Sequence, residues 1–168
     1  MESLFTPQSL SWWEMLTRLG SAALFSFLLG IERYTHNKPI DFRPFVVIAV
    51  ISAALLIALT EFAAQSNDGT FSIDPAKVFS GILTGIGFLG AGALFRDENV
   101  VRGAGSASAI WASGGIGIIC GLGFIWLAGV VAFFLALLLY FSSGLPNVHE
   151  AKDYNGGDDG EGEGSGKS

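Results

Sequence analysis

The sequence predicts an all-α fold, a polytopic transmembrane helical bundle of about five spans that ends in a disordered acidic tail. Hydrophobic residues make up 51% of the 168 residues and only 14% are charged, whereas about 25% of a typical soluble domain is charged. No Asp, Glu, Lys or Arg occurs in the 47 residues 103–149. This composition excludes a soluble enzyme with a charged cleft and a nucleic-acid binder with a basic face.

The expected spans follow from the lengths of the apolar runs. About 20 apolar residues cross the roughly 30 Å of bilayer hydrocarbon. As one helix, the uncharged run would be about 70 Å long, so it must fold back, and Gly121-Leu122-Gly123 marks the turn. The expected spans are about 12–31, 44–62, 78–95, 105–121 and 124–141. Four spans with a re-entrant fourth segment are the alternative.

Each segment has its own supporting pattern. The first opens with Trp12-Trp13, a pair suited to the membrane interface, and is expected to remain as an anchor. Its Glu14 and Arg18 are four residues apart and can pair along one face. The second and third are uncharged between flanking charges, the fourth is rich in small residues, and the fifth is rich in Leu, Val and Phe.

The chain divides into an N-terminal segment 1–11, a transmembrane domain 12–145 and a tail 146–168. The last 19 residues contain 6 acidic and 2 basic residues among glycines, so the tail cannot bury a core and is expected to be disordered. The short-loop bases fall mostly on one side, which predicts an outside N-terminus and a cytoplasmic C-terminus. Six bases mark the cytoplasmic side, against Lys77 on the other: Arg33, Lys38, Arg43, Arg96, Arg102 and Lys152.

Small residues predict close helix packing in the membrane. In the fourth segment they recur every four residues, and this small-residue stripe consists of Gly105, Ala109, Ser113, Gly117 and Gly121. The third segment adds the G-x-x-x-G pair Gly81 and Gly85, followed by Gly87, Gly90 and Gly92. Helices in lipid associate through such close contacts, either within the chain or against another copy or another protein. The literal G-x-G-x-x-G at 85–90 lacks the strand and βαβ unit of a nucleotide site.

Ionisable residues gather at the expected membrane edges. Glu32, Arg33, Arg43 and Arg102 form a candidate cytoplasmic cluster that would fix helix ends. On the outer side, Glu61, Asp68 and Asp74 could collect a hard cation such as Mg²⁺, but a loop without a fixed cage is a weak metal signal. We therefore assign no metal and no cofactor. No nucleophile–base pair is apparent, so no enzyme activity is expected.

Four stretches, taken in order, resemble the MgtC/SapB family of bacterial membrane proteins over about residues 20–141. They are LLGIERYTHNKP at 28–39 with Arg43 following, Asp74-Pro75-Ala76-Lys77, SGILTGIGFLGAGALFR at 80–96, and Val101-Arg102-Gly103 leading to SASAIWASGGIGIICGLG at 106–123. The chain departs from the family pattern after Lys38-Pro39 and after Gly103, and it has an acidic tail where many members have a cytoplasmic regulatory domain.

The resemblance implies a small polytopic domain of the bacterial inner membrane, linked to growth under magnesium limitation and, in pathogens, to survival inside host cells. It also implies a modulator of other membrane proteins more than a transporter. The family motif positions carry over to Glu32, Arg33, Lys38, Pro39, Arg43, Asp74, Pro75, Gly87, Gly90, Gly92, Arg102 and Gly103.

Three functions are compatible with these features. The leading hypothesis is a non-enzymatic membrane subunit that modulates another membrane protein, or assembles with a second copy, through its small-residue helix faces. A divalent-cation transporter or channel is the second, with Glu61, Asp68 and Asp74 as its collecting site. The third is a purely structural subunit of a membrane complex.

Overall fold

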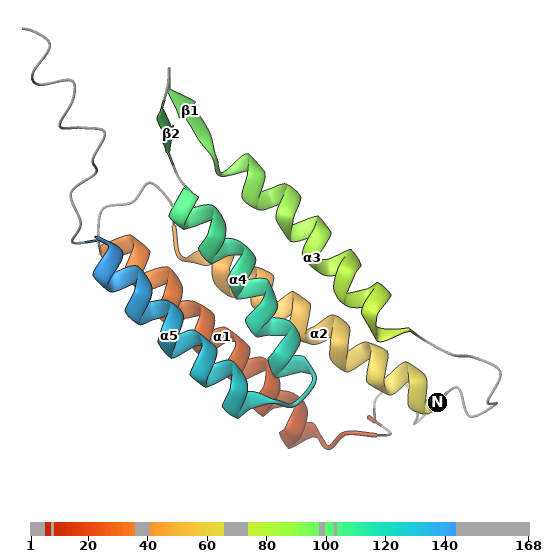
Figure 1. Ribbon diagram of the computed structural model, residues 1–168. Coiled ribbons are helices and arrows are strands. Elements are labelled where there is room, and N and C mark those ends of the chain that lie inside the picture. The colour runs from red at the N-terminus through yellow and green to blue at the C-terminus, as the bar shows by residue number, and fades with distance from the viewer. Residues whose placement is uncertain are drawn as a thin grey trace, which may run out of the picture.

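The computed structural model describes residues 6–7, 9–35, 41–65, 74–97, 100–102 and 104–143. Five helices lie alongside one another and alternate in direction, and a two-stranded hairpin joins the third to the fourth (Figure 1). The elements are α1 (Trp12–Thr35), α2 (Arg43–Gln65), α3 (Pro75–Gly92), β1 (Phe95–Asp97), β2 (Val100–Arg102), α4 (Ala104–Gly121) and α5 (Ile125–Ser143).

The predicted all-α membrane bundle is confirmed. Three segments are long and apolar enough to cross a membrane, Trp12–Ile31 of α1, α2 and α4, and the apolar part of α5, Ile125–Phe141, is only slightly shorter. The fourth segment, which the alternative reading makes re-entrant, forms one unbroken helix of 18 residues. The predicted acidic tail and residues 1–5 of the N-terminal segment lie outside the described residues.

Local chemistry explains where the helices begin and end. At the start of α1, the Ser11 hydroxyl accepts a bond from Glu14 N (3.2 Å) while Glu14 Oε2 accepts one from Ser11 N (2.8 Å), a capping box. Between α4 and α5, Gly123 takes a positive φ of 92°. Its N–H donates to Cys120 O (2.9 Å) and that of Phe124 to Ile119 O (3.1 Å), the Schellman arrangement that favours glycine. The turn expected at 121–123 is therefore present.

The short hairpin was not expected from the sequence. The sequence predicts a charged loop from Arg96 to Arg102. In the structure, β1 and β2 pair antiparallel, with Arg96 opposite Val101 and Asp97 opposite Val100. Strands of three residues are too short to give a recognisable alternation of polar and apolar residues.

The centre of the bundle is α4, which packs against each of the other four helices. Ten of its 18 residues are buried. Its closest neighbour is α2: a Cβ added at Gly117 would meet Ala49 O and lie 2.8 Å from Ala49 Cα, and one at Gly121 would lie 2.7 Å from Ala53 O. The absence of side chains at these glycines lets the two backbones approach.

For α4 the structure shows the first of the expected alternatives, because its small-residue stripe packs mainly within the chain. Ala109, Ser113, Gly117 and Gly121 are buried, and only Gly105 is exposed. The Ser113 hydroxyl donates to Ile110 O within the same helix (2.7 Å), so it needs no partner across the interface. Since α2 covers the stripe, a partner cannot reach it while the bundle is intact.

We expect Gly117→Ala to destabilise the bundle by about 1–3 kcal/mol, the usual cost of overpacking a core, because the added methyl meets the backbone of α2. Gly115→Ala is the matched control on the same helix, since a Cβ there meets nothing within 4 Å. Thermal unfolding in mild detergent, followed by helical circular dichroism, measures both. Equal unfolding temperatures for the two variants would contradict this account of the core.

Candidate functional site

The outer face of α3 is the candidate surface for contact with another helix. On its inner side, Ile86 and Gly90 are buried, and Ile86 joins a cluster with Ala109 and Ile110 of α4. The residues at the next helical spacing, Gly81, Gly85, Phe88 and Gly92, lie on the opposite side and are all exposed.

The open face of α3, defined as Gly81, Gly85, Phe88 and Gly92, is unoccupied within the described chain. A Cβ added at Gly81, Gly85 or Gly92 would meet nothing within 4 Å, and Phe88 is 81% exposed. Of the other α3 glycines, Gly87 is equally open, while Gly90 lies close to α4, with Ala107 O 3.4 Å from its added Cβ. The two glycine-rich helices therefore differ in where their small residues point.

Glu61, a possible cation ligand only in the transporter alternative, holds the segment that precedes α1. Its Oε1 accepts bonds from the Ser9 hydroxyl (2.6 Å), Ser9 N (3.1 Å) and Leu10 N (2.9 Å). This Glu61 clasp fixes the entry to α1 against the last turns of α2.

The expected outer cation site is not assembled in the part of the chain that the structure describes. Asp74 caps α3 by accepting a bond from Ala76 N (3.0 Å), with Pro75 in the first helical position. Asp68 lies outside the described residues. Among the described residues, no group of three or more His, Cys, Asp or Glu side chains is placed to hold a metal ion.

Arg18, which the sequence analysis places only as a possible partner of Glu14, has a structural role at the end of α4. It lies within the apolar span of α1, and its Nη1 donates to Gly121 O (2.8 Å) at the end of α4. An added Cβ at Gly123 would lie 2.9 Å from Arg18 Nη2, so glycine leaves room for the guanidinium. The expected Glu14–Arg18 pair is replaced by this contact and by the α1 cap. Two features of the sequence could have indicated this contact. Arg18 is a single basic residue within an apolar span, and the distant glycine turn has no side-chain donor of its own.

The candidate cytoplasmic cluster is only partly described. Figure 1 places the end of α1, the start of α2 and the hairpin at the same end of the bundle. Arg43 is the one member whose side chain is described, and its Nε lies 3.4 Å from Asp41 Oδ2. For Glu32 and Arg33 at the end of α1, and for Arg96 and Arg102 in the hairpin, the structure describes the backbone alone. Lys38, Pro39 and Gly103 lie outside the described residues.

We expect Glu61→Ala to speed hydrogen exchange at the amides of Ser9 and Leu10 by roughly tenfold or more, because bonds to a charged acceptor contribute about 1.5–3 kcal/mol. Exchange read by mass spectrometry measures this, and Asp74→Ala, which removes a cap elsewhere, should leave those amides unchanged. Added Mg²⁺ should also leave wild-type exchange unchanged. A Mg²⁺-dependent change at Ser9 would count against the clasp and in favour of a cation site.

Comparison with known proteins places the chain among bacterial membrane proteins. Protein SapB of Bacillus subtilis is 35% identical over 120 residues, covering 68% of this chain and 52% of the relative. Protein MgtC of Brucella abortus is 32% identical over 117 residues (70% and 46%), and Protein MgtC of Salmonella typhimurium 33% over 108 residues (64% and 43%). The chain thus spans about half the length of the curated relatives it matches. No solved structure matches it significantly.

The family assignment agrees with the motifs of the sequence. The model described as the MgtC family matches residues 19–148, which include all five helices except the first turns of α1. The chain belongs to the MgtC family.

Proposed function

We propose that this protein is a non-enzymatic integral membrane protein of the bacterial inner membrane that binds and modulates another membrane protein. The single observation that carries the proposal is the open face of α3, which no part of the described chain covers. Its membership of the MgtC family supports a setting of magnesium limitation, which we include in the proposal.

The physical argument rests on how helices recognise one another in lipid. Lipid tails are as apolar as leucine, so association depends on close backbone contact and shape. Gly81 and Gly85 offer a shallow surface for such contact, and Phe88 projects beside them. A partner helix could approach α3 there as closely as α2 approaches α4 inside the bundle.

The proposed orientation has the N-terminus outside and the C-terminus in the cytoplasm. The end of α1, the start of α2, the hairpin and the end of α5 lie at one end of the bundle in Figure 1, and the end of α2 and the start of α3 lie at the other. The sequence assigns six short-loop bases to the first end and Lys77 to the second, which favours a cytoplasmic position for the first end.

A cation transporter has no specific observation in its favour. Of its three collecting carboxylates, Glu61 and Asp74 are used as clasp and cap. Arg18 is the described charge deepest in a span, and it binds a backbone carbonyl. Coupled transport usually uses ionisable groups that face a polar pathway within the membrane.

We expect Gly85→Leu to lose the association of this protein with its membrane partner without loss of fold, because the new side chain fills the open face of α3. Gly20→Leu is the matched control, an equally open glycine on α1. Co-migration in mild detergent, followed by mass spectrometry of the native complex, measures the association. A complex that forms equally with wild type and Gly85→Leu would contradict docking on α3.

Two further measurements separate the alternatives. Proteoliposomes that hold only this protein should show no Mg²⁺ flux above protein-free vesicles, and reproducible flux that Asp74→Asn removes would overturn the modulator proposal. If the partner's activity is the same with wild type and with Gly85→Leu, the protein is a structural subunit rather than a modulator.

A further inference from the structure

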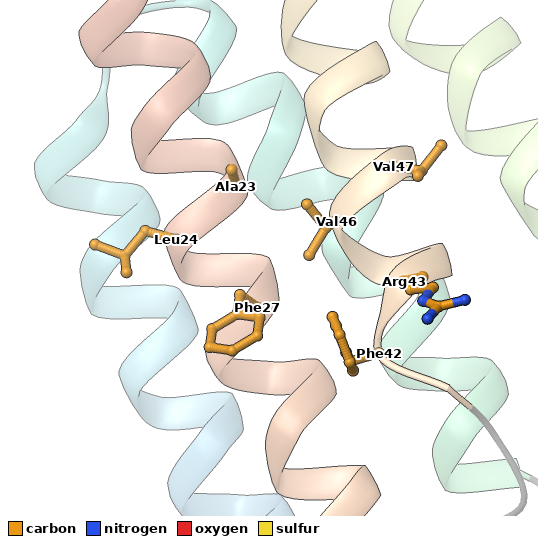
Figure 2. Close-up of a pocket in the computed structure, with 7 residues that line it drawn as sticks. All are labelled: Ala23, Leu24, Phe27, Phe42, Arg43, Val46 and Val47. Carbon is orange, nitrogen blue, oxygen red and sulfur yellow. The ribbon is translucent and has the colours of Figure 1, made fainter.

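A groove runs along the outside of the bundle between α1 and α2, at the end where α2 begins. Its volume is about 450 Å³, within the range of roughly 300–1,000 Å³ typical of small-molecule sites. Figure 2 shows the side chains that line it, with Phe27 and Phe42 between the two helices and Leu24 and Val47 directed outward. The walls are aliphatic and aromatic: Ala23, Leu24 and Phe27 from α1, and Val46 and Val47 from α2.

One end of the groove is closed by a fixed aromatic pair. The rings of Phe27 and Phe42 meet edge to face, with centroids 5.5 Å apart and an interplanar angle of 87°. Gly30 allows this approach, because a Cβ added there would lie 2.9 Å from Phe42 Cβ. The groove is therefore held by packing and does not depend on a mobile side chain.

A positive charge stands at the rim. Arg43, the first residue of α2, lines the groove with its stem, and its side chain is 79% exposed. Its contact with Asp41 uses Nε at 3.4 Å, a long and exposed pair of little energetic weight. The two outer nitrogens of the guanidinium point away from the apolar walls (Figure 2), and their four N–H donors are suited to an anionic oxygen group.

The charge and the walls lie at different depths in the membrane. The apolar span of α1 ends at Ile31, and Leu24, seven residues earlier, lies about 10 Å deeper at 1.5 Å per residue. Val47 lies about 6 Å deeper than Arg43 by the same rise. Leu24 and Val47 are each more than half exposed, so in a membrane the groove opens sideways onto lipid.

We propose that this groove binds an anionic phospholipid, with an acyl chain between α1 and α2 and the phosphate at Arg43. A soluble anion would leave the apolar walls unused, and a neutral hydrocarbon would leave Arg43 unused. A helix of another protein, about 10 Å across with its side chains, would fill this volume with about one turn. Basic sites between transmembrane helices commonly take anionic lipid headgroups.

The test is native mass spectrometry of the full chain in mild detergent, titrated with phosphatidylglycerol or with phosphatidylcholine of the same acyl chains. Wild type should retain phosphatidylglycerol preferentially. Arg43→Gln should reduce that preference by about fivefold, the share of one interfacial base, and Arg43→Lys should keep part of it. Lys77→Gln, which removes an exposed base at the other end of the bundle, is the matched control and should change nothing.

A second set of variants tests the apolar walls. Ala23→Phe fills the groove and should reduce retention of both lipids, whereas Gly20→Phe, at an open position outside the groove, should not. Glycerol 3-phosphate at equal concentration should not displace the lipid, because it lacks an acyl chain; displacement would indicate a headgroup site only. Helical circular dichroism checks that each variant is folded. Equal phosphatidylglycerol retention by wild type, Arg43→Gln and Ala23→Phe would overturn the proposal.

Discussion

The close approach of α2 and α4 at Gly117 and Gly121 is the contact on which the rest of the bundle depends. Because α4 touches all four other helices, its distance from α2 sets where α1, α3 and α5 can pack. Ala49 and Ala53 on α2 and Cys120 on α4 are fully buried beside it. Because no hydrophobic force acts between helices in lipid, this close backbone contact is a main interaction that holds the bundle together.

Polar groups in this protein are used sparingly, and those described serve mainly to tie segments together. Arg18 caps the end of α4 from α1, Glu61 holds the segment before α1, and Asp74 starts α3. Arg18 and Asp74 satisfy backbone groups that a helix end leaves open, and Glu61 binds the amides of the segment before α1. These contacts lie at the end of the bundle where α1 begins, where the glycine turn itself supplies no side-chain donor.

The two glycine-rich helices illustrate why a single sequence pattern has two meanings. The small-residue stripe of α4 points inward and packs against α2, whereas Gly81 and Gly85 of α3 point away from every described neighbour. The same chemistry thus builds the core in one helix and leaves an open surface in the other. That surface supports the proposed modulator role, and the groove at Arg43 supports the separate proposal of a lipid site.

The sequence by itself determined the class, the approximate limits of all five helices, the turn at Gly123 and the family, because hydropathy, glycine spacing and local caps are properties of neighbouring residues. It missed the hairpin, whose strands are too short to show a pattern. It could not decide which small residues pack within the chain and which face outward, nor which groups Glu61 binds. Only the tertiary structure could decide these points, because which face of a glycine helix is covered, and which donor reaches a carboxylate 52 residues away, depend on how distant segments pack.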